Sequence, residues 1–226
     1  MSSPLKLEFS RKYDHAHAQA YPHKHQDGAW RRLSHWRDEQ LARRALAAAG
    51  EPGLVLDLPC GAGRFWPQLA GKANRVLIGA DQSADMLRTA CAAQPAELVK
   101  RVRLLQTSAF AIDLPDNAVD SIFCMRLLHH LGAAQHRLAL LRECRRVTRD
   151  RLSLSLWVDG NYKAWKRKRL ERRRQAAPGQ DGYPNRFVLP VATAEDEFRQ
   201  AGFRIQQRLD FLPWYAMWRV YVLRKG

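Results

Sequence analysis

Short apolar runs bounded by turn residues recur along the chain. LVLDL at 54–58 and RVLIGAD at 75–81 have the length and the aliphatic content of buried strands. Later runs are equally short, and polar segments separate them. The pattern predicts seven strands, at 54–58, 75–81, 102–107, 119–125, 151–158, 203–211 and 216–225.

The segments between these runs have helical periodicity. In the first of them, Trp30, Leu33, Trp36, Leu41 and Ala45 are spaced to share one face of a helix. Pro67 restricts a second helix to about its first turn. Ser83 can cap a third helix, and Thr193 or a neighbour can open the last one with a capping box. The longer predicted helices are 30–49, 84–94, 134–147 and 193–202.

Strands that alternate with helices at this spacing predict parallel pairing, with helices on both faces of the sheet. The expected fold is therefore α/β and Rossmann-like, with a mostly parallel seven-stranded sheet. We expect an N-terminal lid or helical segment at 1–49, a nucleotide-binding core at 50–158, a basic insertion at 159–192, and a C-terminal part at 193–226 that completes the sheet.

The positive charge of the chain is concentrated in its C-terminal third. The chain carries a net charge of +16 in 226 residues. Residues 1–150 have 22 basic and 15 acidic side chains, and residues 151–226 have 16 and 7, so the shorter part is the more basic. A field of this sign attracts polyanions such as RNA, an anionic membrane surface or a nucleotide.

The run KAWKRKRLERRR at 163–174 concentrates this charge, with eight basic residues in twelve. Three interpretations compete. The run is a solvated charged helix, it docks on phosphate groups of RNA or of an anionic lipid surface, or it holds a nucleotide effector. Arg169 and Arg173 have the R-x-x-x-R spacing of the last interpretation, but its companion motif is absent. The insertion follows the fifth strand, which favours a role in acceptor recognition.

The remaining composition limits the class of protein. No apolar run reaches the roughly 18 residues that a membrane span needs, and the N-terminal residues lack the apolar centre of a secretory signal. The expected compartment is the cytoplasm. Cys60, Cys91, Cys124 and Cys144 have no CxxC spacing, so we expect reduced and mostly buried thiols.

A candidate ligand site follows the first strand, in the sequence DLPCGAG at 57–63. In an open parallel sheet, ligands bind beyond the carboxyl ends of the strands. Gly61 and Gly63 would let a ligand approach the backbone. The third glycine of a dinucleotide motif is replaced by Trp66, which argues against NAD. A nucleoside with an amino-acid tail fits better, because Asp57 can accept from its amine and Asp81 from both ribose hydroxyls.

Three stretches in order carry a family resemblance: VLDLPCGAGRF, VLIGADQSADML and SAFAIDLPDNAVDSIFCMRLLHHL. They resemble the class I S-adenosylmethionine (SAM)-dependent methyltransferases, and most of all the ubiquinone-type and other small-molecule enzymes. The resemblance covers about 50–158. It implies methyltransferase activity with SAM as the cofactor, which binds at Asp57, Pro59, Cys60, Gly61, Gly63, Asp81, Gln82, Met86, Ser108, Ala109, Cys124 and Met125.

The sequence departs from the family pattern at two of these positions. Pro59 replaces the first glycine and removes one amide donor from the turn. Ser108 replaces an aspartate that in relatives contacts adenine. Catalytic candidates are His129 and His130 after the fourth strand, where a general base would serve an oxygen or nitrogen acceptor. An alternative is that both histidines only pack beside the next helix. The N-terminal HAH and HKH segments lack acidic partners, so we expect no metal.

These observations predict a SAM-dependent methyltransferase that acts on a small molecule or on an anionic lipid or glycolipid. It would be cytoplasmic and could dock peripherally at the inner membrane face. The alternatives are an RNA methyltransferase, although NPPY-like and DPPF-like motifs are absent, and a non-catalytic cofactor-binding subunit that responds to nucleotides. The residues expected to bind the substrate or a polyanion are Tyr21, Arg126, Lys166, Arg167, Arg169 and Arg173.

Overall fold

A computed structural model describes residues 29–175 and 186–226. The described strands are β1 (Leu54–Asp57), β2 (Val76–Asp81), β3 (Val102–Gln106), β4 (Val119–Cys124), β5 (Thr148–Val158), β6 (Val188–Leu189), β7 (Phe203–Asp210) and β8 (Trp218–Lys225). The helices are α2 (Ala29–Ala48), α3 (Trp66–Leu69), α4 (Ala84–Ala93), α5 (Ala96–Val99), the 3₁₀ helix η3 (Leu128–His130), α6 (Ala134–Val147), α7 (Tyr162–Gln175) and α8 (Val191–Gln200).

These strands form a single sheet with the order β3-β2-β1-β4-β5-β8-β7. The strands β1 to β5 run parallel, whereas β8 is antiparallel to both β5 and β7. The two-residue strand β6 pairs with the end of β5, off the main path. All seven predicted strands are present, and the α/β prediction of a mostly parallel sheet is confirmed.

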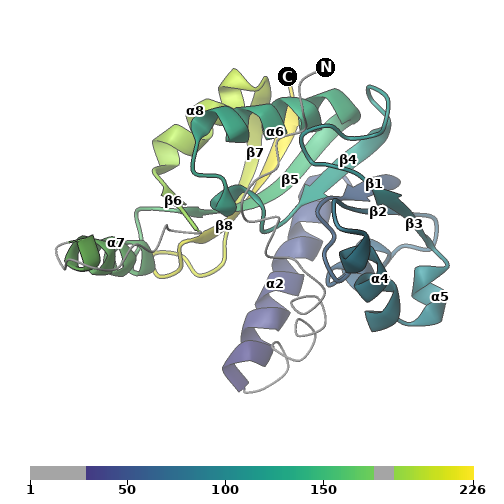
Figure 1. Ribbon diagram of the computed structural model, residues 1–226, viewed down its shortest axis with the longest axis horizontal. Helices are drawn as coiled ribbons and strands as arrows, with labels where there is room; N and C mark the ends of the chain where they lie inside the picture. Colours follow the sequence, from purple (N-terminus) through teal and green to yellow (C-terminus); the bar gives the residue numbers. More distant parts are fainter. Residues whose placement is uncertain (1–28, 176–185) are drawn as a thin grey trace.

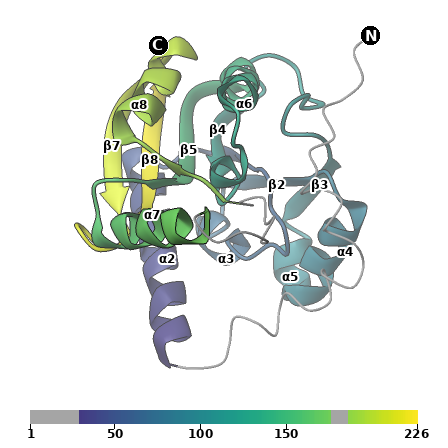
Figure 2. The ribbon, with the colours of Figure 1, turned by 60° about the vertical axis from the view of Figure 1, so that its left-hand side comes forward.

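Helices cover both faces of this sheet (Figure 1). On one face α6 and α8 pack over a core that includes Leu140 and Phe198. On the other face α2, α3 and α4 pack over a second core around Leu41 and Trp66. The largest buried side chains come from both layers, so neither layer is a peripheral addition. Figure 2 shows α7 beside the start of β8 and outside both layers.

Two details of the helices differ from the sequence prediction. Leu33 and Trp36 are half exposed, because only the second half of α2 lies against the sheet, where Leu41 and Ala45 are buried. Helix α8 starts at Val191 after Pro190, and no side chain caps it, so the capping box at Thr193 is wrong. Proline suits this position because the first turn of a helix needs no N–H from it.

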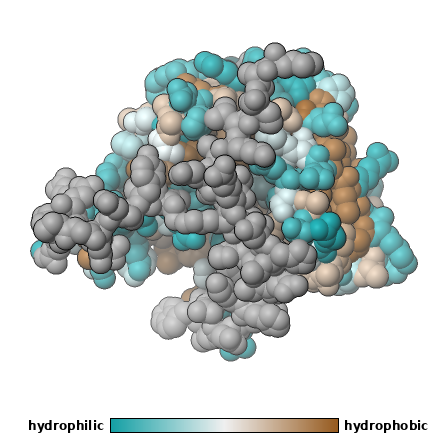
Figure 3. All heavy atoms as spheres, viewed as in Figure 1, coloured by the Kyte–Doolittle hydropathy of each residue, from teal (hydrophilic) through white to brown (hydrophobic). Residues whose placement is uncertain are grey.

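The surface in Figure 3 is largely hydrophilic, with apolar residues on the side where β2 and β3 lie. Leu104 is exposed on β3, the edge strand of the sheet, and Val76 is exposed at the start of β2. No helix in the described ranges has both the length and the apolar character needed to cross a bilayer.

Candidate functional site

The parallel strands β1, β2, β4 and β5 end at the same edge of the sheet, and two carboxylates lie there. Asp57 is the last residue of β1 and Asp81 the last of β2. In the register of the two strands Asp57 lies opposite Gly79, two residues before Asp81. The aspartates therefore reach the same edge, as the sequence predicts.

Asp57 is almost completely buried, with 1% of its surface exposed. Its Oδ2 has no hydrogen-bond partner among the described residues. Burial raises the pKa of this carboxyl well above its ordinary value, and the charge of Asp81 raises it further, against a weaker opposing effect of the Trp66 indole. A buried carboxylate without a partner is costly, so the site favours a ligand that brings a positive charge.

Asp81 is buried as well, but each of its carboxylate oxygens accepts a hydrogen bond from a backbone amide. Its Oδ2 accepts a hydrogen bond from the Gly61 amide at 3.0 Å, and its Oδ1 accepts from the Ser83 amide at 2.9 Å. Burial raises the pKa of Asp81, and these amide hydrogen bonds oppose that rise. Each carboxylate oxygen has a second lone pair, so both can still accept from a diol.

The turn after β1 is held against β2. The Cys60 amide donates to the Ala80 carbonyl at 2.8 Å, and Gly61 and Gly63 have φ angles of 53° and 67°. A Cβ on Gly63 would lie 2.8 Å from the ring of Trp66, which is fully buried. Glycine at 63 is thus required by contact with Trp66, a reason that the sequence analysis did not give. At Gly61, by contrast, a Cβ would meet only the end of Met86, at 3.6 Å.

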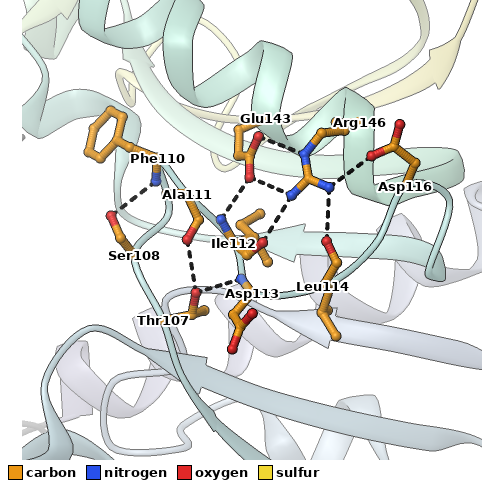
Figure 4. Close-up of polar contacts among 10 residues, drawn as sticks. All are labelled: Thr107, Ser108, Phe110, Ala111, Ile112, Asp113, Leu114, Asp116, Glu143 and Arg146. Carbon is orange, nitrogen blue, oxygen red and sulfur yellow. Dashed lines mark hydrogen bonds and ion pairs between the residues drawn. The ribbon is translucent and has the colours of Figure 1, made fainter. Parts of the chain in front are cut away.

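The next loop of this edge is anchored to α6, as Figure 4 shows. Glu143 accepts from the Ile112 amide at 2.7 Å, and Arg146 donates to the carbonyls of Ile112 and Leu114, both at 2.9 Å. Burial alone would raise the pKa of Glu143, but the hydrogen bonds from Arg146 and Ile112 hold it below its ordinary value. This anchor fixes the loop that carries Ser108, whose hydroxyl accepts from the Phe110 amide at 3.2 Å.

Beyond β4, an ion cluster joins three segments of the chain. Asp38 of α2 is buried, and its Oδ2 lies 2.6 Å from Nη2 of Arg64 and 2.5 Å from Nη2 of Arg126. Arg126 has a φ of 63°, and its amide donates to Ser155 of β5 at 2.9 Å. The Nε of Arg126 is buried without a hydrogen-bond partner among the described residues. Sequence reasoning missed Asp38, because nothing distinguishes it from the other charges of its helix.

His129 belongs to an aromatic cluster. Its ring stacks on Trp157 with centroids 4.9 Å apart, and it meets the edge of Trp218 at 5.0 Å. Burial lowers the pKa of His129 to about 2, with smaller contributions from His130 and nearby arginines. Its Nδ1 is buried and unpaired in the described part of the chain. His129 is therefore neutral at physiological pH and a weak base, which does not suit the role of general base.

Three guanidinium groups surround this cluster. That of Arg126 lies 5.2 Å from the ring of Trp218, and those of Arg167 and Arg186 lie 4.9 and 5.5 Å from the ring of Trp157. Guanidinium groups stack on indoles through cation–π attraction. Arg186 was not a sequence candidate, since it comes 19 residues after Arg167. Only the packing of the β6 segment against η3 brings it here, through the Phe187 amide and the His129 carbonyl at 2.7 Å.

A small cleft, partly open to solvent and with space for about one water molecule, adjoins both the ion cluster and the aromatic cluster. It lies between α2, the turn after β1, and the ends of β4, β5 and β8. Its lining is apolar apart from Asp38, Arg126 and Ser155. The lining residues are Asp38, Leu41, Ala42, Phe65, Phe123, Met125, Arg126, Ser155, Trp218 and Val220.

Comparison with known proteins adds an independent line of evidence. Residues 55–151 match a family described as a methyltransferase domain. No curated protein matches the sequence. The core of this chain is a SAM-dependent methyltransferase domain.

Solved structures share the fold of this methyltransferase domain at low sequence identity. Magnesium protoporphyrin IX methyltransferase from Synechocystis PCC 6803 with bound SAH is 18% identical, with a TM-score of 0.73 over 96% of this chain and 99% of that one. Its structure with bound SAM has a TM-score of 0.68 at 15% identity, over 99% and 100% of the two chains. The [4+2]-cyclase SpnF is 18% identical, with a TM-score of 0.62 over 83% and 80%. The ubiquinone-type subgroup is not confirmed.

The residues at the carboxyl edge, the edge of the sheet at which the parallel strands end, fit SAM. The unpaired Oδ2 of Asp57 matches the ammonium of its amino-acid part, and Asp81 retains acceptor capacity for its ribose. Of the other predicted cofactor residues, Met86, Cys124 and Met125 are buried close to this edge, whereas Gln82 is exposed. Their individual roles stay predictions.

The predicted substrate residues are divided between two places. Arg126 and Arg167 lie at the aromatic cluster, and Lys166 and Arg169 are exposed on α7. Tyr21, the side chain of Arg173 and the HAH and HKH segments lie outside the described residues. Within the described residues, no group of three or more histidine, cysteine or acidic side chains could hold a metal ion. All four cysteines are free, and three of them are buried.

Proposed function

We propose that this methyltransferase transfers the methyl group of SAM to a small molecule that carries an anionic group. The observation that carries the proposal is the convergence of Arg126, Arg167 and Arg186 on the aromatic cluster of His129, Trp157 and Trp218. A planar part of the acceptor would stack on the indoles, and the guanidinium groups would hold its carboxylate or phosphate.

The charge balance around the cluster supports this acceptor chemistry. Arg126 shares the single carboxylate of Asp38 with Arg64, and Arg167 has Glu171 at 2.8 Å. Among the ion pairs of the described residues, Asp38 thus serves two guanidinium groups at once and Glu171 serves that of Arg167. The unpaired Nε of Arg126 and Nδ1 of His129 are further polar atoms to which a ligand could hydrogen-bond. A bound anion would bring the cluster closer to neutrality.

When bound, SAM supplies an electrophilic methyl group on its sulfonium. Asp57 would hold the ammonium and Asp81 the ribose hydroxyls, and Met86, Ser108 and Ala109 would lie along the adenine. The segment at Cys124 and Met125 would border the reacting groups and exclude water from them. Because His129 is a weak base, the acceptor suits the site best when its nucleophile is already ionised.

The experiment supplies radiolabelled SAM together with cell metabolites separated by anion exchange. We expect label in small molecules that the anion exchanger retains. The variants Arg126→Gln and Arg167→Gln should lower the transfer efficiency by about 10–100-fold, because each removes a charged hydrogen bond. Their affinity for SAM should change less than about twofold, and Arg103→Gln on the exposed edge strand β3 is the matched control.

The other outcomes identify the alternatives. Label in RNA would overturn the proposal in favour of an RNA methyltransferase. Label in neutral metabolites would contradict the anionic acceptor. Retained SAM binding with no label in any pool would favour a non-catalytic subunit.

We also propose that the protein docks on an anionic membrane surface. Its basic helix α7 and the exposed aromatic residues beside it support this proposal.

A further inference from the structure

Exposed apolar side chains gather at one end of the molecule. Of the large apolar side chains that are exposed in the described residues, six lie on α7 and on the loop between β7 and β8. The most exposed is Trp214, with 86% of its surface free. We call this surface the α7 face; its apolar members are Tyr162, Trp165, Leu170, Leu212, Trp214 and Tyr215.

Backbone hydrogen bonds join the helix and the loop of the α7 face. The amides of Tyr162 and Lys163, in the first turn of α7, donate to the carbonyls of Trp214 and Tyr215 at 2.9 and 3.0 Å. The ring of Tyr162 stacks on that of Tyr215 with centroids 5.8 Å apart, and it lies 6.0 Å from that of Trp165. Trp214 has a φ of 62°, rare for a residue with a side chain. The loop is therefore held in a defined position while its indole stays in solvent.

The orientation of α7 is fixed from its other side. Ala164 is buried, its amide donates to Oδ1 of Asn161 at 3.0 Å, and Lys168 pairs with Asp159 at 3.2 Å. With about 100° between successive residues of a helix, positions 162, 166 and 169 point away from Ala164. The exposed apolar and basic side chains therefore share the outward face of the helix. Figure 2 shows α7 itself at the front of the molecule.

The charge of the α7 face is positive. The ammonium of Lys163 lies 5.2 Å from the ring of Tyr215, and the guanidinium of Arg169 lies 5.5 Å from that of Trp165. No carboxylate among the described residues forms an ion pair with Lys163, Lys166 or Arg169. Three cations that form no ion pair within the described part of the chain thus lie among aromatic and aliphatic side chains.

We infer that the α7 face docks on the surface of an anionic lipid bilayer. Tryptophan and tyrosine prefer the region between headgroups and acyl chains, and the lysines and arginines would contact the lipid phosphates. Leu170 and Leu212 favour lipid over RNA, because aliphatic side chains gain from insertion between acyl chains but cannot stack on bases as aromatic ones do. This inference rests on the membrane docking proposed above and assigns it to one surface. It does not depend on the methyl acceptor, and its test needs no measurement of activity.

The test is co-sedimentation of the full chain with vesicles of phosphatidylcholine alone and of phosphatidylcholine with 30% phosphatidylglycerol, about a third anionic lipid. We expect binding to the anionic vesicles only. The double variant Trp165→Ser/Trp214→Ser should bind about tenfold more weakly, because it loses apolar area that would enter the bilayer. The triple variant Lys163→Gln/Lys166→Gln/Arg169→Gln should lose roughly 100-fold.

A matched triple variant removes the same charge elsewhere: Arg44→Gln, Arg103→Gln and Arg142→Gln, all exposed on α2, β3 and α6. It should bind the anionic vesicles almost as well as the wild type. An equal loss in both triple variants would show attraction by net charge alone and would overturn the assignment of this surface. Unchanged binding of the tryptophan double variant would do the same. If the wild type bound single-stranded RNA but no vesicles, and the α7-face variants lost that RNA binding, the ligand of the α7 face would be RNA and the membrane assignment would be wrong.

Discussion

The two halves of the carboxyl edge have opposite electrostatic character. At the ends of β1 and β2, burial raises the pKa of Asp57 and Asp81, so negative charge is held there at a cost. Beyond β4 and β5, arginines surround a neutral His129 whose pKa is lowered to about 2. The first half, which we call the acidic half, suits a cation such as an ammonium. The second, which we call the basic half, suits an anion. A methyltransferase that joins SAM to an anionic acceptor needs this arrangement.

The largest expected effect tests the acidic half. Asp57→Asn should weaken SAM binding by about 100-fold, since it removes the charge opposite the ammonium. The same change should raise the melting temperature of the free protein by about 2–4 °C, because Oδ2 of the buried carboxylate has no hydrogen-bond partner in the described ranges. A raised pKa in an acid means that its ionised form destabilises the fold, fully so above that pKa, and the gain should therefore disappear in acid.

Calorimetry with SAM and thermal unfolding measure these two effects. Asp113→Asn, in an exposed loop, is the control and should change neither. Loss of both stability and affinity in Asp57→Asn would show that the carboxylate is needed by the fold itself, and the contrast between the two halves would fail.

The second test concerns the turn of the acidic half. Gly63→Ala should destabilise the protein by about 3 kcal/mol, because the new Cβ meets Trp66 at 2.8 Å at a positive φ. Gly160→Ala is the matched control, with a φ of 78° and nothing within 4 Å. It should cost only the backbone term, about 1 kcal/mol. Urea unfolding measures the free energy of unfolding of both variants. An equal loss in the two would show that contact with Trp66 is not the cause.

The third test concerns the basic half. His129 is protonated in the unfolded chain below a pH of about 6.5 but stays neutral in the folded protein down to about pH 2. Stability should therefore fall with decreasing pH, by about 2 kcal/mol from this residue between pH 7 and pH 5. His129→Gln should reduce that fall. His136→Gln, on α6, serves as the control, and identical pH dependence in wild type and His129→Gln would exclude a buried neutral ring.

The smallest effect is expected at the loop anchor beside the acidic half. Glu143→Gln should cost about 1 kcal/mol at pH 7, because the hydrogen bonds to Arg146 lose their charge. A lowered pKa means that this contribution is present above the unfolded pKa and is lost as the pH falls through the folded pKa. The difference from wild type in urea unfolding should therefore shrink in acid. A difference that grows in acid would contradict the anchor in Figure 4.

Several long-range ion pairs of the molecule could not be predicted from the sequence. The ion cluster joins Asp38 to Arg64 and Arg126, residues up to 88 positions apart. The buried pair of Arg137 and Glu197 joins α6 to α8 across 60 positions, at 2.8 and 2.6 Å. Charged residues at such separations leave no periodic signal, because their partners are chosen by the packing of helices and not by local spacing.

What the sequence determined by itself is the order of the elements and the acidic half of the edge. Apolar periodicity depends on neighbouring residues, and in a parallel sheet it follows that Asp57, Asp81 and the glycine turn between them meet at one edge. Tertiary structure alone decided which of 38 basic residues approach Trp157 and Trp218, and that Trp214 is exposed beside α7. The physical reason is that long cationic side chains tolerate both solvent and aromatic surfaces, so only their neighbours in space select between the two.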